Sequence, residues 1–70
     1  MVFAKEQIET DPILKFFTAD HLKSPMQEIG DSFASMAMYI VTTVPRNAER
    51  TVALRKLLEA KDAAVRAVLP

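Results

Sequence analysis

The sequence predicts an all-α protein in which a short N-terminal helix precedes an antiparallel hairpin of two long helices, assembled as a homo-oligomer. Apolar residues recur every three or four positions in two long runs, which is typical of helices with one buried face. The connection between the runs, Pro45 to Asn47, is so short that the helices have to run antiparallel. The chain has 70 residues, no cysteine and one histidine. Since so small a core needs a supplement, and disulfides or a metal site cannot supply it, we expect oligomerisation.

The short helix is expected over residues 12–19. Asp11 is a suitable cap, and Pro12 is tolerated at the first helical position because an N–H would have no helical partner there. An apolar cluster follows within about two helical turns. Its members are Ile13, Leu14, Phe16 and Phe17.

The second helix is expected over residues 25–44. Ser24 serves as its cap, Pro25 takes the first helical position, and Gln27 stands three residues after the serine, which is the capping-box spacing. Pro45 ends the helix. An apolar stripe runs along it at helical spacing, consisting of Met26, Ile29, Phe33, Met36 or Ala37, Ile40 and Val44.

The third helix is expected over residues 48–68, with Asn47 as its cap. Arg50 and Lys61 stand eleven residues apart and therefore share one face. Apolar positions along the helix are Val52, Leu54, Leu57, Leu58, Ala60, Ala64, Val65 and Val68. Oppositely charged residues four positions apart predict two ion pairs, Arg55 with Glu59 and Asp62 with Arg66.

Both long helices are apolar on more than one side. Residues 36–41 are apolar all round the second helix, and the leucines, alanines and valines of the third span more than one face. A hairpin buries one stripe per helix, so we expect a second copy of the chain to cover the other apolar sides. Gly30 indicates either close helix packing or room for a ligand or a neighbouring chain.

The charge pattern disfavours some partners. The formal net charge is zero, which argues against a protein that coats long nucleic acid. Residues 1–45 contain three basic and six acidic residues, whereas residues 46–70 contain six basic and three acidic ones. This division suits self-packing of copies, or a small anionic ligand bound by the second half.

No segment predicts a membrane span or a signal peptide. The most apolar stretch, residues 33–41, is far shorter than the roughly 20 residues that a spanning helix needs. The first residues lack the basic, apolar and small-residue order of a signal peptide. Because the chain has no cysteine, it suits a reducing compartment, and we expect a cytoplasmic protein.

The residues also argue against catalysis. A lone His21 cannot form a transition-metal site within one chain. One glycine in the whole chain excludes a glycine-rich phosphate loop. No serine has an identifiable base and orienting group beside it. We therefore expect a protein that is not an enzyme and that needs no metal or other cofactor.

Anion binding is more plausible, because helix N-termini offer unpaired N–H groups and a positive dipole end. Polar and cationic residues adjoin both starts, namely His21, Lys23 and Ser24 before the second helix and Arg46, Arg50 and Thr51 around the third. Phe16 or Phe17 could stack on a nucleobase beside Pro25, although such aromatics are more often core residues. The alternative for Lys23 and Arg46 is that they are solvated loop charges.

A longer series of residues resembles a known family. The series comprises Phe16-Phe17, His21-Leu22, Gln27, Phe33, Ala37, Ile40, Pro45, Glu49-Arg50-Thr51 and the run from Leu57-Leu58-Glu59-Ala60 to Val65-Arg66. Over residues 16–67 the chain resembles the small helical phage proteins that act as anti-CBASS cyclic-oligonucleotide sponges. The resemblance implies a compact homohexamer that binds cyclic dinucleotides, and in many members cyclic trinucleotides, without cleaving them. It also implies that the protein blocks CBASS immune signalling in the cytoplasm of the infected bacterial host.

The resemblance implies two sets of binding residues. A dinucleotide pocket between protomers would use Phe17, His21, Lys23 and Pro25. A trinucleotide site would use Arg50, Thr51 and Arg66. Ala19 departs from the family, whose members often carry an aromatic residue there, so either a neighbouring phenylalanine substitutes or dinucleotide binding is weaker or absent. The alternative function is a structural or regulatory hairpin module that oligomerises and has no small-molecule ligand.

Overall fold

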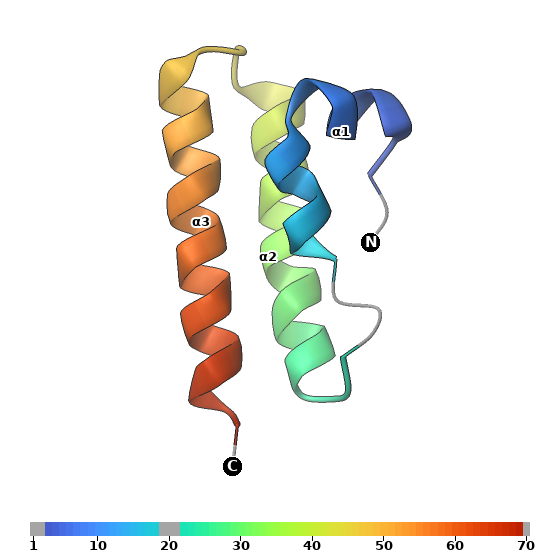
Figure 1. The fold of residues 1–70 in the computed structure, drawn as a ribbon, viewed down its shortest axis with the longest axis vertical. Coiled ribbons are helices and arrows are strands. Elements are labelled where there is room, and N and C mark those ends of the chain that lie inside the picture. The colour runs from blue at the N-terminus through green and yellow to red at the C-terminus, as the bar shows by residue number, and fades with distance from the viewer. Residues whose placement is uncertain (1–2, 19–21, 70) are drawn as a thin grey trace.

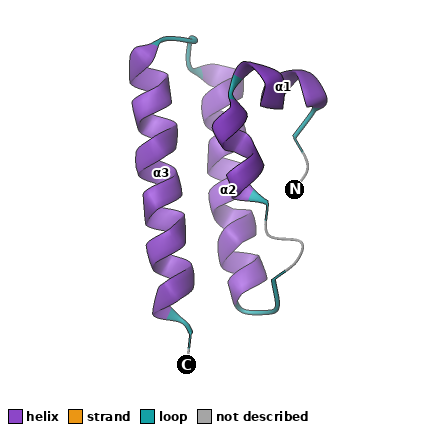
Figure 2. Ribbon diagram, viewed as in Figure 1, coloured by secondary structure: helices purple, strands orange, loops and turns teal. Residues whose placement is uncertain are grey.

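The computed structural model describes residues 3–18 and 22–69 and is helical over most of them (Figure 1, Figure 2). The elements are α1 at Lys5–Thr10, the 3₁₀ helix η1 at Pro12–Phe17, α2 at Met26–Thr43 and α3 at Ala48–Ala67. They contain 78% of the described residues, and none of those residues is in a strand. The prediction of an all-α protein is therefore confirmed.

The two long helices, α2 and α3, lie side by side and run in opposite directions (Figure 1). The connection between them spans residues 44–47, and Val44 is extended, as expected for a residue that precedes proline. α1 and η1 lie against one face of this pair, and η1 contacts both long helices. The molecule measures 38 × 21 × 16 Å along its three principal axes.

Of the two caps predicted for the long helices, one forms and the other does not. Asn47 caps α3 as predicted, since its Oδ1 accepts a hydrogen bond from the Arg50 N–H at 2.9 Å. The capping box predicted at Ser24 is wrong. The Ser24 hydroxyl donates to the Glu28 carboxylate and makes no bond to a backbone N–H, so α2 begins at Met26 without a side-chain cap.

The N-terminal segment contains more helix than the sequence predicted. The short helix predicted over residues 12–19 is observed as a 3₁₀ helix over Pro12–Phe17, with Thr18 outside it and residue 19 outside the described residues. Helix α1 precedes it where no element was expected. The Gln7 Oε1 accepts a hydrogen bond from the Ala4 N–H at 2.8 Å, which closes the first turn of α1. Asp11 does not cap η1 as predicted, because its carboxylate binds Arg50 of α3 instead.

A small core lies where the two long helices meet the N-terminal segment. Its buried apolar residues are Phe3, Leu14, Phe17, Ala34, Ala37 and Leu54. α2 contributes only small buried residues, with Gly30 beside the two alanines, in agreement with the close-packing interpretation of this glycine. The larger Met36 and Tyr39 remain 50% and 62% exposed, so part of the apolar surface of α2 is uncovered in the protomer.

Candidate ligand sites

The molecule has two ends, which we name by their residues. The open end comprises residues 22–26, where α2 begins, and residues 66–69, where α3 ends. The connection end comprises residues 44–51, where the chain passes from α2 into α3. Because the long helices run antiparallel, these two ends lie at opposite extremes of the molecule (Figure 1).

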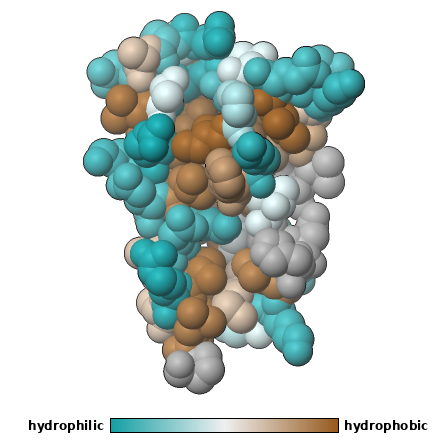
Figure 3. Space-filling view, in the orientation of Figure 1, coloured by the Kyte–Doolittle hydropathy of each residue, from teal (hydrophilic) through white to brown (hydrophobic). Residues whose placement is uncertain are grey.

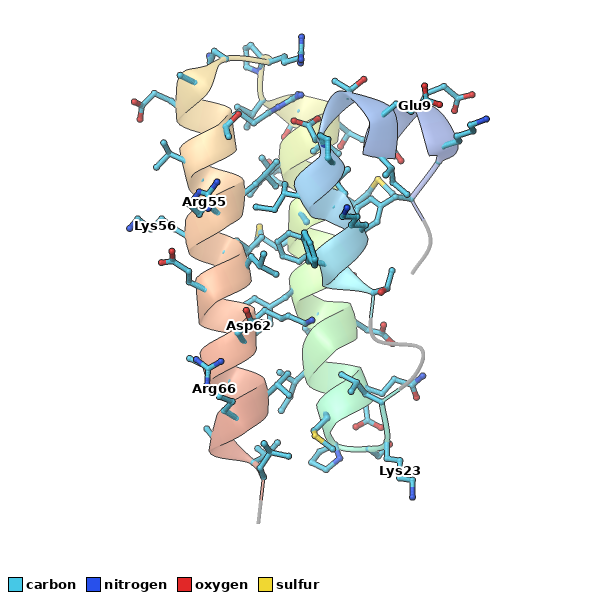
Figure 4. The ribbon with its side chains drawn as sticks, viewed as in Figure 1. Glu9, Lys23, Arg55, Lys56, Asp62 and Arg66 are labelled. Carbon is cyan, nitrogen blue, oxygen red and sulfur yellow. The ribbon has the colours of Figure 1, made fainter. Side chains whose placement is uncertain are left out.

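Two of the predicted binding cations lie at the open end. Lys23 and Arg66 are both exposed, on opposite sides of this end (Figure 4). Within the described residues neither side chain forms an ion pair or a hydrogen bond. The predicted ion pair of Asp62 with Arg66 is not formed. The predicted pair of Arg55 with Glu59 is not formed either, and the Glu59 carboxylate instead lies 3.8 Å from the Lys56 ammonium. Arg66 is therefore available for a ligand.

The other residues predicted for the dinucleotide pocket differ in access. Pro25 is exposed, and His21 lies outside the described residues. Phe17 has no exposed surface, because its ring fills the centre of the core, and it cannot stack on a ligand in this protomer. Phe16 is 55% exposed, with the Lys15 ammonium 5.2 Å from its ring centroid. If an aromatic face replaces the one missing at Ala19, it is Phe16 and not Phe17.

The Arg50 side chain, at the connection end, binds other groups of its own protomer. It is 6% exposed, and its guanidinium donates to the Asp11 carboxylate at 2.7 Å and to the Val44 carbonyl at 3.0 Å. The prediction of Arg50 as a ligand-binding cation is therefore corrected, because it joins the N-terminal segment to the C-terminus of α2. Beside it, the exposed Thr51 donates its hydroxyl to the Asn47 carbonyl at 3.4 Å.

An open depression of about 340 Å³ adjoins Arg50. Its lining consists of Glu6, Gln7, Thr10, Asp11, Val41, Arg46 and Arg50. Arg46 is the exposed cation of this lining, and Glu6 supplies an opposing charge. The depression therefore has mixed charge and does not select strongly for anions.

The three residues assigned to a trinucleotide site do not meet within one protomer. Arg50 and Thr51 lie in the first turn of α3, whereas Arg66 lies in its last turn. Sixteen positions along an α-helix correspond to about 24 Å. Within the protomer Arg66 therefore shares an end with Lys23 and Pro25, and any site that combines it with Thr51 needs more than one copy.

Two contacts that the sequence did not predict hold the N-terminal segment in place. Asp11 pairs with Arg50, and the buried Lys61 donates to the Phe16 carbonyl at 2.9 Å. The sequence feature that points to Lys61 is its eleven-residue spacing from Arg50, which indicates that the two residues share one face of the helix. Both cations do point inward from that face, toward the two ends of η1.

The face that carries α1 and η1 is mixed in character. Hydrophilic side chains cover α1, and hydrophobic ones gather between η1 and α3 (Figure 3). No helix of the described segments has the length and apolar character to cross a bilayer. The described residues also hold no group of three or more His, Cys, Asp or Glu side chains that could bind a metal ion.

Comparison of the chain with protein-family models, with curated proteins and with solved structures gave no match.

Proposed function

We propose that this chain is a sponge that binds and sequesters cyclic dinucleotides, cyclic trinucleotides or both, without cleaving them, as a homo-oligomer with six copies. The observation that carries the proposal is the pair of exposed cations at the open end, Lys23 and Arg66, which have no partner among the described residues. Cyclic oligonucleotides present two or three phosphates and flat bases. Such ligands suit unpaired cations, and the exposed Pro25 and Phe16 present flat faces on which a base can stack.

The resemblance of residues 16–67 to the phage sponges supports the same ligand class. On this proposal the protein acts in the cytoplasm of an infected bacterium, where it withdraws the messenger of CBASS signalling from the host effector. Binding without cleavage needs only affinity, so the mechanism rests on charge and stacking and not on a nucleophile. Arg50 contributes indirectly, because it stabilises the protomer that presents the other groups.

The test is isothermal titration calorimetry of the purified protein against a panel of cyclic dinucleotides and trinucleotides. We expect saturable binding of at least one nucleotide, and chromatography should recover that nucleotide intact. Lys23→Glu and Arg66→Glu should each weaken binding at least tenfold while the oligomer keeps its mass. The matched control is Arg55→Glu, which reverses another exposed cation on α3 and should leave binding unchanged.

The outcomes separate the sponge from the alternative function, a structural or regulatory oligomerisation module. If the charge reversals change the assembly itself, and no cyclic nucleotide binds below millimolar concentration, the module is the correct function. If binding persists in both reversed variants, the open end is not the binding site.

A further inference from the structure

The face of the α2/α3 pair opposite α1 and η1 has no described element against it. Side chains near the covered face are identified by their contacts. Met38 of α2 contacts Gln7 of α1, with 3.3 Å between the sulfur and the amide nitrogen, and Lys61 of α3 reaches Phe16 of η1. Residues on the other side of each buried stripe point to the opposite surface. We call this surface the back face.

Each long helix carries an apolar seam along the back face. The α3 seam consists of Ala53, Leu57, Ala60, Ala64 and Ala67, and the α2 seam of Ile29, Phe33, Met36 and Ile40. Both follow alternating steps of four and three residues, which is the spacing that packs one helix against another. The α3 seam is built mainly of small side chains and the α2 seam of large ones, so the two surfaces are complementary in size.

A hollow lies between the seams. It has a volume of about 200 Å³ and is lined by Ser32, Phe33, Met36 and Leu57. Met36 is half exposed at its edge. An apolar hollow flanked by helical seams accepts side chains of another helix, as holes accept knobs in helix packing.

The size and charge of the back face fit a stable interface. The 38 × 21 Å outline of the molecule sets an upper limit of about 800 Å² on the back face, which is comparable with what one partner contributes to a standard-size interface. No charged residue belongs to either seam; Glu49 and Lys56 lie at the edge of the α3 seam. An apolar centre with charges at its rim is the usual composition of such interfaces.

We propose that a second copy of this chain docks on the back face, with α2 of each copy packed against α3 of the other. A two-fold axis parallel to the helices produces this arrangement and sets each large-residue seam against a small-residue seam. The result is a four-helix bundle in which every neighbouring pair of helices is antiparallel. The open ends of the two copies then lie at the same end of the bundle.

This inference rests on the self-association that forms part of the proposed function, and it names the surface and the orientation. The alternative two-fold axis, perpendicular to the helices, would set the large seam on the large seam and small on small. That arrangement would crowd Phe33 and Met36 against their own copies and leave gaps between the alanines.

The first experiment measures the mass of the nucleotide-free protein by sedimentation equilibrium. The wild type should have an even number of chains. Met36→Glu and Ala60→Glu should reduce the mass to half or less while the helical circular dichroism is retained, because each buries a charge in a seam. Ser35→Glu adds the same charge to α2 one position away, on the other side of the helix, and should keep the wild-type mass. A monomeric wild type, or an unchanged mass in both seam variants, would overturn the proposal.

A second experiment reports on orientation without destabilising charges. The chain has no cysteine, so Met36→Cys and Ala60→Cys each introduce a single thiol. After the two variants are mixed, a short bis-maleimide should join Met36→Cys chains to Ala60→Cys chains in preference to chains of the same variant. Cross-links confined to chains of the same variant would exclude the proposed orientation.

Both experiments omit nucleotide, so their outcome is independent of ligand binding. A monomer that still binds cyclic nucleotides would overturn the docking of copies and leave the sponge proposal standing. A dimer that binds none of the panel would do the reverse.

Discussion

The charged groups of Arg50 and Lys61 bind partners inside the protomer, at the two ends of η1. Arg50 binds Asp11 just before η1, and Lys61 binds the carbonyl of Phe16 near its end. The spacing of the two cations is visible in the sequence, but their partners are not. Asp11 and Arg50 are 39 residues apart along the chain, and Phe16 and Lys61 are 45 apart, so only the packing of η1 on α3 brings them together.

The Asp11–Arg50 pair predicts a large effect of Asp11→Asn. The substitution keeps the shape of the side chain but leaves the buried guanidinium with no opposing charge. We expect a loss of about 3 kcal/mol in the free energy of unfolding, at the lower end of the range for broken buried pairs, because Arg50 keeps the Val44 carbonyl. Urea denaturation followed by circular dichroism measures it. Glu9→Gln removes an exposed charge of the same sign and should change the stability little; equal losses in both variants would contradict the structural role of the pair.

Lys61→Met tests the second contact. Methionine retains most of the apolar stem but leaves the Phe16 carbonyl without its donor, which should cost about 1–3 kcal/mol. The amide hydrogens of η1 should also exchange faster with solvent in this variant. Lys56→Met, at an exposed position of the same helix, is the control and should stay close to the wild type. If Lys61→Met is no less stable than this control, the hydrogen bond does not hold η1 in place.

At the scale of elements, the sequence predicted the two long helices well and the N-terminal segment poorly. Strong periodicity and Pro45 predicted α2 and α3 to within two residues of their observed bounds. Helix α1 has only six residues, too few to be stable alone, so local sequence signals are weak. It forms because Phe3 is buried in the core and Gln7 reaches Met38. Such long-range contacts cannot be derived from local pattern.

The two predicted caps of the long helices give a direct comparison. Asn47→Ala should destabilise the protein by about 0.5–2 kcal/mol, because the Arg50 N–H loses its acceptor. Ser24→Ala should cost less, since the Ser24 hydroxyl contacts only the Glu28 side chain. Thermal denaturation of the two variants in parallel measures the difference. A greater loss from Ser24→Ala would mean that the serine, and not the asparagine, is the effective cap.

The candidate site was predicted in part at this scale. Lys23, Pro25 and Arg66 lie at the surface, as ligand contacts must, whereas Phe17 and Arg50 lie inside. A phenylalanine pair and a cation at a helix start are ambiguous in sequence, because the same residue types serve cores and binding sites. Only burial distinguishes Phe17 from its exposed neighbour Phe16.

For the whole molecule, the distribution of apolar surface matters more than its amount. The accessible area is 4635 Å², close to the about 4,400 Å² expected of a monomeric protein of this mass. The sequence argument for oligomerisation relied on the small size of the core and on apolar residues on more than one side of both long helices. The structure sharpens this argument, because the uncovered side of the α2/α3 pair concentrates apolar residues in two adjacent seams and leaves the charges elsewhere.

Such a surface predicts that thermal stability depends on protein concentration. If folding is coupled to the docking of copies, a hundredfold increase in concentration adds about 2.7 kcal/mol per dimer and should raise the midpoint of unfolding by on the order of 5–10 °C. Differential scanning calorimetry over that range measures the shift. Met36→Glu should abolish the dependence and Ser35→Glu should keep it, because the former lies in a seam and the latter does not. A midpoint that is independent of concentration in the wild type would mean that the folded protomer is stable without a second copy on its back face.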